Sequence, residues 1–339
     1  MTQTKTQMTE TQTRSPIIGV FDSGFGGLTV LRALLPLVPG AHYIYLGDTA
    51  RLPYGSKSRE TVARYAVSSA KFLHEQGADL LVIACNTATA LAFEDIQRAL
   101  PIPVIGVVQP GAHAALQSTP PFQESSFPEP PSQESSFRPK RSEVEKSASL
   151  PPPPRVPHVR DGLIVANVGL SSPPPLSPQN QVLVLATAAT VRSRAYTHAL
   201  NALDLAAHEK ACPLLVPLVE EGWINHPVTD EVLRIYLTEA LNEAPNAQTL
   251  LLGCTHYPLI EPAIRRVLAT IGHPLIVIDS ADATARAVAA HPALATHRSE
   301  EKTPNCTFYA TDSIEKFQRL GSNFLGQPVA KVNLVDLGG

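Results

Sequence analysis

The sequence has little of what metal-binding, secreted or membrane proteins need. Only four of its 339 residues are cysteine, widely spaced and without a CxxC pair, so neither a zinc site nor a disulfide framework is expected. No apolar run approaches the length of a transmembrane helix, and the first fifteen residues lack the apolar centre of a signal peptide. The net charge of −3 does not point to nucleic acid or an anionic membrane as partner. These absences favour a reducing, cytoplasmic setting.

Proline is abundant but unevenly spread. Fifteen of the 32 prolines lie between Pro120 and Pro178, in a segment with too few apolar side chains to offset the entropy of ordering it. We therefore predict a disordered, low-complexity insertion over residues 117–180, in which only Gly162–Leu170 could form a short strand. Residues 1–15 are predicted to be a disordered tail.

Outside the insertion, short aliphatic runs alternate with segments of helical periodicity, which predicts an α/β fold with parallel sheets and right-handed crossovers. The predicted strands are Ile17–Phe21, Tyr43–Leu46, Leu80–Ala84, Val104–Val108, Val182–Leu185, Pro213–Val216, Thr249–Leu252 and Leu275–Ile278. The predicted helices are Leu28–Leu37, Thr61–Gln76, Arg192–Leu203, Thr229–Asn242 and Leu259–Ile271.

Two of these strands end on a cysteine followed by hydrogen-bonding residues. Cys85 follows Leu80–Ala84 and Cys254 follows Leu250–Gly253, and ligands bind at the carboxyl ends of strands in open parallel sheets. If a helix begins after each cysteine, its dipole favours the thiolate. The other two cysteines, Cys212 and Cys306, are interpreted as small buried hydrophobic residues.

The spacing of these strand ends indicates an internal repeat. Asp22 precedes Cys85 by 63 residues and Thr187 precedes Cys254 by 67, counted along the sequence. We predict two pseudo-symmetric, Rossmann-like lobes with a cleft between them. Residues 16–108 and 280–339 would form the first lobe, with Asp22 and Cys85, and residues 109–116 and 181–279 the second, with Thr187 and Cys254.

Polar residues at the same strand ends are candidates for binding. The loop Asp22–Gly27 lies between a strand and a helix, but it is neither a dinucleotide fingerprint nor a phosphate loop; a carboxylate-sized anion suits it better, with Asp22 holding an ammonium group or assisting a base. Tyr54 and Gly55 follow the second strand, His256 could exchange a proton with Cys254, and Glu220 could balance the first cysteine. Hydroxyl donors at the strand end equivalent to Asp22 are Thr187, Thr190 and Ser193.

Two opposed thiols can remove a proton from one face of a carbon and return one to the other face, which inverts a stereocentre. No metal cluster is evident, and no lysine lies beside the cysteine motifs to hold pyridoxal phosphate. We therefore expect neither a metal nor a cofactor, so desolvation and fixed hydrogen-bond donors must acidify the carbon.

Five motifs in order resemble the glutamate racemase family of the cofactor-independent aspartate/glutamate racemase superfamily. The resemblance covers about Ile17–Leu116 and Val182 to the C-terminus. The motifs are Gly19–Leu28 (GVFDSGFGGL), Gly47–Gly55 (GDTARLPYG), Ala84–Ala88 (ACNTA), Cys212–Gly222 (CPLLVPLVEEG) and Gly253–Pro258 (GCTHYP).

The resemblance implies a role for each matching residue. Cys85 would act on the D enantiomer and Cys254 on the L enantiomer, with Asp22, Glu220 and His256 assisting proton transfer. The residues that would bind glutamate are Asp22, Ser23, Tyr54, Gly55, Asn86, Thr87, Thr255 and His256, to which we add Thr187 and Thr190. The resemblance further implies a bacterial cytoplasmic enzyme that supplies D-glutamate for peptidoglycan. Family members often form homodimers, but no interface is evident in the sequence.

Two features depart from the family pattern: Ala186 replaces the usual glycine before Thr187, and the 117–180 insertion is far longer than the family's connection. The alternatives to glutamate racemisation are racemisation of aspartate or a related substrate, a cysteine-dependent hydrolase or C–N lyase, and a regulator that binds ligand without turnover. Loss of either thiol should abolish proton exchange in a racemase, whereas a hydrolase needs only one.

Overall fold

The computed structural model describes residues 14–118, 181–295 and 303–338. The predictions for the N-terminal tail, the 117–180 insertion and the strand at Gly162–Leu170 therefore lie almost entirely outside the described residues. At one edge they can be checked, because helix α4 (Val108–Ser118) includes the first two residues assigned to the insertion. The predicted start of the insertion, residue 117, is thus too early.

The first sheet contains six strands, and β1 (Ile17–Asp22) is one of its two middle strands. All of its pairings are parallel, and the order is β10-β9-β2-β1-β3-β4. The other strands are β2 (His42–Gly47), β3 (Leu80–Ile83), β4 (Val104–Gly106), β9 (Asn305–Ala310) and β10 (Val332–Leu334).

The second sheet has four parallel strands in the order β6-β5-β7-β8. Its strands are β5 (Gln181–Ala186), β6 (Ala206–Ala211), β7 (Ala247–Gly253) and β8 (Ile276–Asp279). This order across the sheet matches β2-β1-β3-β4 of the first sheet, so β5 corresponds to β1 and β7 corresponds to β3. The two-lobe parallel α/β fold predicted from the sequence is confirmed.

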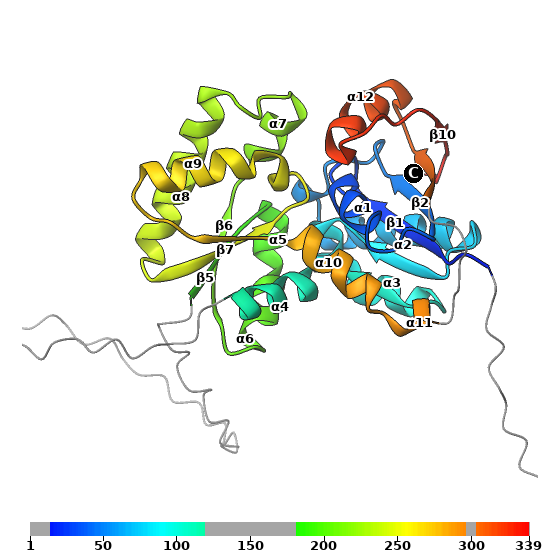
Figure 1. Cartoon of the computed structure of the whole chain (residues 1–339), viewed down its shortest axis with the longest axis horizontal. Coiled ribbons are helices and arrows are strands. Elements are labelled where there is room, and N and C mark those ends of the chain that lie inside the picture. The colour runs from blue at the N-terminus through cyan, green and yellow to red at the C-terminus, as the bar shows by residue number, and fades with distance from the viewer. Residues whose placement is uncertain (1–13, 119–180, 296–302, 339) are drawn as a thin grey trace, which may run out of the picture. The chain divides into compact units, whose positions relative to one another are not determined.

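Helices cover both faces of each sheet (Figure 1). On the first sheet, α2 (Arg59–Glu75) and α3 (Asn86–Ala99) pack on one face, and α1 (Leu28–Leu34) and α12 (Ile314–Leu325) on the other. On the second sheet, α4 and α6 (Ala195–Asn201) cover one face, and α8 (Pro227–Glu243) and α9 (Glu261–Thr270) the other. The remaining helices are α5 (Ala188–Ser193), α7 (Leu215–Glu220), α10 (Ser280–Ala289) and α11 (Pro292–Ala295), with single 3-10 turns at Tyr54–Ser56 and Tyr257–Ile260.

Buried aliphatic side chains account for this layering. The inner strands β1, β3, β5 and β7 are buried on both faces, as expected when helices cover both sides of a parallel sheet. One buried cluster continues from the first sheet, through Val20 and Tyr45, to the second, through Leu185 and Leu252. The two lobes therefore share hydrophobic core, and the loops at their strand ends are held against each other.

The strand predicted at Pro213–Val216 is wrong. Helix α7 begins at Leu215, and the edge strand β6 lies earlier, at Ala206–Ala211. This strand was missed because its sequence, AAHEKA, is short of large apolar side chains: it is half-buried and pairs only with β5. The predicted helix Arg192–Leu203 is divided into α5 and α6 at Arg194, whose φ of 57° cannot continue a helix.

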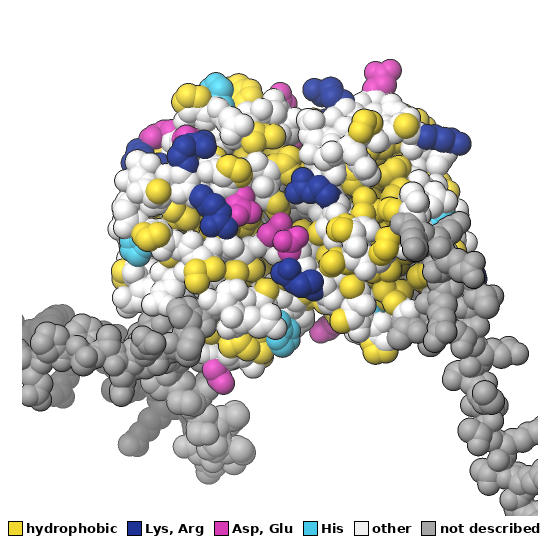
Figure 2. All heavy atoms as spheres, viewed as in Figure 1, with side chains coloured by type: hydrophobic (Ala, Val, Ile, Leu, Met, Phe, Trp, Pro, Cys, Tyr) yellow, Lys and Arg dark blue, Asp and Glu magenta, His cyan; other side chains and the backbone are white. Residues whose placement is uncertain are grey.

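On the face shown in Figure 2, acidic and basic side chains are interspersed and neither sign forms a large patch. This pattern agrees with the small net charge of the chain. Among the described residues, no helix is long and apolar enough to span a membrane.

Candidate active site

Both strand-end cysteines line one cavity of about 520 Å³. Its walls come from the loops after β1, β2 and β3 of the first sheet and after β5, β6 and β7 of the second, because parallel strands present their carboxyl ends at the same edge of a sheet. The cavity brings together most of the residues predicted from the sequence: Ser23, Tyr54, Gly55, Cys85, Asn86, Thr87, Thr187, Glu220, Cys254, Thr255 and His256.

Cys85 caps the N-terminus of α3. Its sulfur accepts a hydrogen bond from the backbone N–H of Ala88 at 3.4 Å and lies 3.4 Å from the Ser23 hydroxyl. The predicted helix start is therefore present, but the predicted thiolate is not favoured. Burial, followed by the nearby charge of Asp22, raises the pKa of the Cys85 thiol to about 12, so the free side chain is a thiol at neutral pH.

Asp22 lies below the cavity wall rather than on it, with 1% of its surface exposed. One carboxylate oxygen accepts the backbone N–H of Gly24 at 2.8 Å, so an N–H group that we expected to bind an external anion is already bonded to Asp22. The other oxygen, Oδ1, has no hydrogen-bond partner among the described residues. Burial raises the pKa of this carboxyl.

The loop after β1 also touches the second lobe. A side-chain carbon on Gly26 would lie 2.2 Å from the Thr255 hydroxyl and 2.7 Å from His256 Nδ1. Only glycine therefore permits this close approach of backbone to the Cys254 loop. Nearby, the Thr29 hydroxyl donates to the backbone oxygen of Thr255 at 3.2 Å.

Cys254 is the first member of a chain of ionisable groups. Its sulfur lies 3.9 Å from His256 Nδ1, and His256 Nε2 lies 3.3 Å from Glu220 Oε1. Burial disfavours the charged imidazole, but the contacts with Cys254 and Glu220 outweigh burial and raise the pKa of His256 to about 10. The ring therefore carries a positive charge at neutral pH and faces the Cys254 sulfur.

An α-helix begins directly after Cys85, as predicted, but not after Cys254. After Cys254 the chain makes a turn and then the 3-10 segment Tyr257–Ile260, and the first α-helix begins only at Glu261. The positive group beside this sulfur is the His256 side chain. The positive charge beside the Cys254 sulfur therefore does not come from the helix dipole that we predicted. It comes from His256, which lies 3.9 Å from the sulfur, as the predicted pairing of the two residues requires.

Tyr54 and Gly55 both lie in the cavity wall. The Tyr54 hydroxyl donates to the buried Asp48 carboxylate, which also pairs with Arg51 at 2.8 Å. The tyrosine hydroxyl thus has a protein partner, leaving its ring to shape the cavity. Gly55 lies against Thr187 of the second lobe, where an added carbon would approach to 3.0 Å.

Three hydroxyl groups meet where α3 and α5 begin. Thr87 lies 2.9 Å from Thr187 and 3.2 Å from Thr190, and the two threonines of the second lobe lie 3.0 Å apart. Thr190 is fully buried and does not reach the cavity wall. We therefore interpret it as holding the other two hydroxyls, and its contact with a ligand stays a prediction.

Several cavity residues were not singled out from the sequence. Arg192, exposed on α5, is the one lysine or arginine in the described wall. Cys212 also lines the cavity, although burial raises the pKa of its thiol to about 12. Tyr196 is fully buried behind the wall and accepts a hydrogen bond from the Asn86 amide at 2.7 Å. This contact leaves Asn86 Oδ1 without a partner among the described residues. Arg192 and Tyr196 lie outside the five motifs, and Cys212, which begins the fourth motif, was interpreted only as a small buried hydrophobic residue.

A larger cavity of about 850 Å³ lies among α3, α4 and α10. It contains neither Cys85 nor Cys254, so size alone does not identify the chemical site. Within residues 14–118, 181–295 and 303–338, no group of three or more histidine, cysteine, aspartate or glutamate side chains is arranged to hold a metal ion.

Comparison with known proteins agrees with the geometry. The family model described as Asp/Glu/Hydantoin racemase matches residues 18–123 and 176–288. The glutamate racemase of Koribacter versatilis is 44% identical, over 96% of this chain and 98% of that relative. The crystal structure of glutamate racemase from Thermus thermophilus has a TM-score of 0.69 at 36% identity and covers 96% of this chain and 98% of that one.

A second solved structure carries a ligand of direct interest. Glutamate racemase from Francisella tularensis, in complex with D-glutamate, has a TM-score of 0.71 at 29% identity and covers 96% of this chain and 98% of that one. The fold, the paired thiols and nearly full-length relatives agree, and this chain belongs to the Asp/Glu/hydantoin racemase family.

Proposed function

We propose that this chain is a glutamate racemase, which interconverts L- and D-glutamate by two-thiol proton transfer at Cα without a cofactor. The observation that carries the proposal is the presence of Cys85 and Cys254 in one cavity, at equivalent strand ends of two lobes with the same strand order. A carbon held between them presents one face to each sulfur. Sulfurs in separate cavities would have excluded this chemistry.

In the direction from L to D, the Cys254 thiolate removes the Cα proton, and the Cys85 thiol gives its proton to the opposite face of the carbanion. The product is the other enantiomer, and the two sulfurs have exchanged protonation states. The surroundings fit this starting state: the pKa of Cys85 is raised to about 12, while Cys254 faces a protonated imidazole. The reverse reaction begins with Cys85 as thiolate.

The cavity also offers groups that can bind an amino acid. Asn86 Oδ1 is a buried acceptor in the wall without a partner among the described residues, which suits the α-ammonium group. Asp22 Oδ1 also has no partner among these residues, but it lies behind the wall, so its contact with the ammonium group stays a prediction. Hydroxyls of Ser23, Thr87 and Thr187 can donate to carboxylates, and the cation of Arg192 can pair with one of them. Glutamate is the substrate proposed because the full-length relatives are glutamate racemases and one similar structure holds D-glutamate.

All of these groups come from a single chain, so the proposed reaction does not require a residue from a second copy. We place the enzyme in the bacterial cytoplasm, where D-glutamate is used for peptidoglycan synthesis. Within the proposal, His256 acts through Cys254 and Asp22 through Cys85. Glu220, which the sequence suggested as a balance for Cys85, instead contacts His256 at 3.3 Å and so acts through Cys254.

The test is transfer of solvent deuterium to substrate. Purified protein, incubated in D₂O with L-glutamate and no added cofactor, should replace the Cα hydrogen and produce D-glutamate, observed by proton NMR and by chiral chromatography. Parallel samples contain D-glutamate, L-aspartate and D-aspartate. Exchange with aspartate alone would assign an aspartate racemase instead, and no exchange with any of the four would contradict a racemase.

A further inference from the structure

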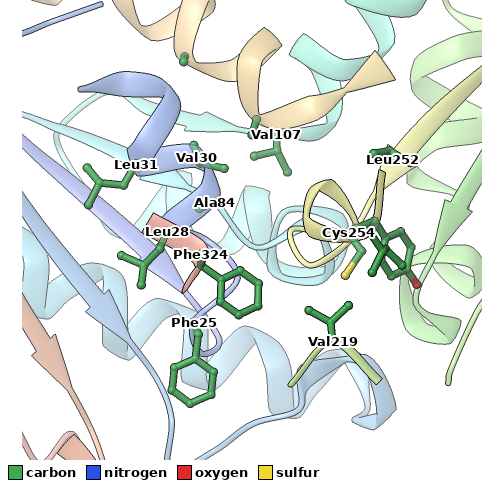
Figure 3. Packing of buried hydrophobic residues seen from close by; sticks show 14 of the residues in the cluster. Phe25, Leu28, Val30, Leu31, Ala84, Val107, Val219, Leu252, Cys254 and Phe324 are labelled. Carbon is green, nitrogen blue, oxygen red and sulfur yellow. The ribbon is translucent and has the colours of Figure 1, made fainter. Parts of the chain in front are cut away.

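The C-terminal helix α12 belongs to the first sheet but touches the acid–base chain of the second lobe. The Lys316 ammonium group lies 3.5 Å from Glu220 Oε2. On the same helix, the Phe324 ring packs edge-on against the His256 ring, with 5.1 Å between centroids and 77° between planes. Figure 3 shows Phe324, Val219 and Cys254 together in one buried cluster. A helix of one lobe thus contacts the chain that ends at the sulfur of the other.

Glu220 uses its two oxygens for two different partners. Oε1 accepts from His256 Nε2 at 3.3 Å, and Oε2 pairs with Lys316 at 3.5 Å. The order of contacts is therefore Lys316, Glu220, His256 and Cys254. With one oxygen fixed by the lysine, the carboxylate plane is oriented and its other oxygen faces the imidazole, as in other chains where an outer group orients an inner one.

Lys316 is itself held in place. Its ammonium group lies over the Phe25 ring, 5.4 Å from the centroid, and such cation–π contacts stabilise a defined position of the charge. Phe25 follows β1, in the loop that also contains Gly26, whose backbone lies against His256. The first lobe therefore holds Lys316 in place and also contacts His256, the imidazole that Lys316 helps to orient through Glu220.

We propose that Lys316 is a positioning residue for racemisation, which holds Glu220 toward His256 and so makes the acid–base function of Cys254 depend on contact between the two lobes. This inference rests on the proposed racemase function. Lys316 does not line the cavity, and its role is exerted through Glu220.

The charges around Glu220 indicate what its loss would do. The ionisable groups acting on this carboxyl are His256, from the turn after β7, and Lys316, from α12; Glu221 is its neighbour at the end of α7. Burial alone would raise the pKa of Glu220, but His256 first and then Lys316 hold it below its ordinary value. Without the lysine, the Glu220 carboxylate takes up a proton at a higher pH, and a neutral Glu220 no longer supports the charged imidazole.

The experiment compares Lys316→Met, Lys316→Arg and the control Lys71→Met, which removes the same charge from an exposed position on α2 of the first lobe. For Lys316→Met, the acidic limb of the pH profile of kcat/KM should move to higher pH. At pH values below the midpoint of this limb, kcat/KM should fall roughly three- to fivefold, the scale of a half-exposed ion pair. Because the enantiomers have equal free energy, kcat/KM must fall by the same factor in both directions.

Lys316→Arg should restore the profile, and Lys71→Met should leave it unchanged. A merely structural role would lower activity and melting temperature together without moving the limb, so thermal melting is measured on every variant. An unmoved limb in Lys316→Met, in protein that melts like wild type, overturns the inference.

A double variant tests whether the lysine acts through Glu220. In the Glu220→Gln background, Lys316→Met should have no further effect on the limb, since no carboxylate remains to be held; an undiminished effect there would overturn the inference. Wild-type protein without racemase activity would refute the proposed function itself, and this result is distinct from active wild type with an unaltered Lys316→Met profile.

Discussion

The two lobes have the same strand order but opposite charges beside their cysteines. Strands β2-β1-β3-β4 and β6-β5-β7-β8 correspond one to one, and each lobe places a nearly buried cysteine, 5% or 6% exposed, after its third strand in chain order. In the first lobe the nearby ionisable group is the carboxyl of Asp22. In the second lobe it is the imidazole of His256.

This contrast separates position from reactivity. The repeated backbone brings two sulfurs to one cavity, as a reaction between mirror-image molecules requires, while the ionisable neighbours of the two sulfurs differ. Burial and Asp22 favour the Cys85 thiol, whereas the Cys254 sulfur lies 3.9 Å from the charged His256 ring. Two sulfurs with unlike surroundings suit opposite roles, one as the acid on one face of the carbon and the other as the base on the opposite face.

The strongest disruption removes one sulfur. Cys85→Ala and Cys254→Ala should each lower kcat for racemisation by at least about 10³-fold, because a positioned acid or base contributes about 10²–10⁴-fold and the reaction needs both. Cys306→Ala is the matched control, since Cys306 lies in β9 and does not line the cavity. Optical rotation of glutamate measures the rates. Near wild-type activity in either active-site variant would show that a single thiol suffices, as in a hydrolase or lyase.

The second disruption makes the surroundings of the cysteines more alike. His256→Asn removes the cation beside Cys254 and should lower kcat/KM by about 100-fold, the middle of the range for acid–base groups. The pKa of His256 is raised to about 10, so the wild-type ring loses its proton as pH rises through that value, and the alkaline decline of activity there should be absent from the variant.

Alkylation of the thiols measures the same difference between Cys85 and Cys254 without catalytic turnover. With iodoacetamide at pH 7.5, peptide mass spectrometry of the wild type should show Cys254 alkylated faster than Cys85, because the thiolate is the reactive form. The difference should shrink in His256→Asn. Equal rates in the wild type would show that His256 does not activate Cys254.

The sequence predicted best what depends on local pattern. Apolar runs that end in Cys85 and Cys254 identify buried strands without knowledge of the rest of the chain, and the structure has β3 and β7 there. The loop Asp22–Gly27 was singled out as part of the site, and its Gly26 lies against Thr255 and His256. The half-buried edge strand β6 has no such pattern and was misplaced.

Properties that depend on packing could not be predicted. A helix N-terminus suggested a thiolate at Cys85, but burial and the charge of Asp22 outweigh the dipole, and both are known only once the lobes are folded. Lys316 and Phe324 reach the site from a helix about 60 residues after His256 in the sequence. No local motif connects a lysine there with a glutamate at the end of α7.

A smaller effect is expected where the lobes meet through hydroxyls. Thr87→Val keeps the side-chain shape but removes the hydroxyl that lies 2.9 Å from Thr187 and faces the cavity. Because the loss is about one or two hydrogen bonds to a carboxylate and to Thr187, KM should rise roughly tenfold with a smaller change in kcat. Steady-state kinetics in both directions measure this. Thr89→Val is the control, since Thr89 bonds the backbone of its own lobe outside this cavity; an equal rise of KM there would refute a specific role for Thr87.

At the connection between the lobes we expect a substitution to change the stability of the protein but not its activity. Asp279 ends β8 and caps α10, which packs on α1, by accepting the Ala281 N–H at 2.8 Å. Burial raises the pKa of Asp279 to about 6, above its value in an unfolded chain. The folded state therefore prefers the protonated acid, and stability present at low pH is lost as pH rises through about 6.

Asp279→Asn keeps an oxygen for the cap without the charge. It should stabilise the protein by roughly 1–2 kcal/mol at pH 8 and by much less at pH 4, measured by urea unfolding. The exposed neighbour Asp282→Asn should change stability little at either pH, and a gain in Asp279→Asn that did not depend on pH would show that burial of this charge is not its cause.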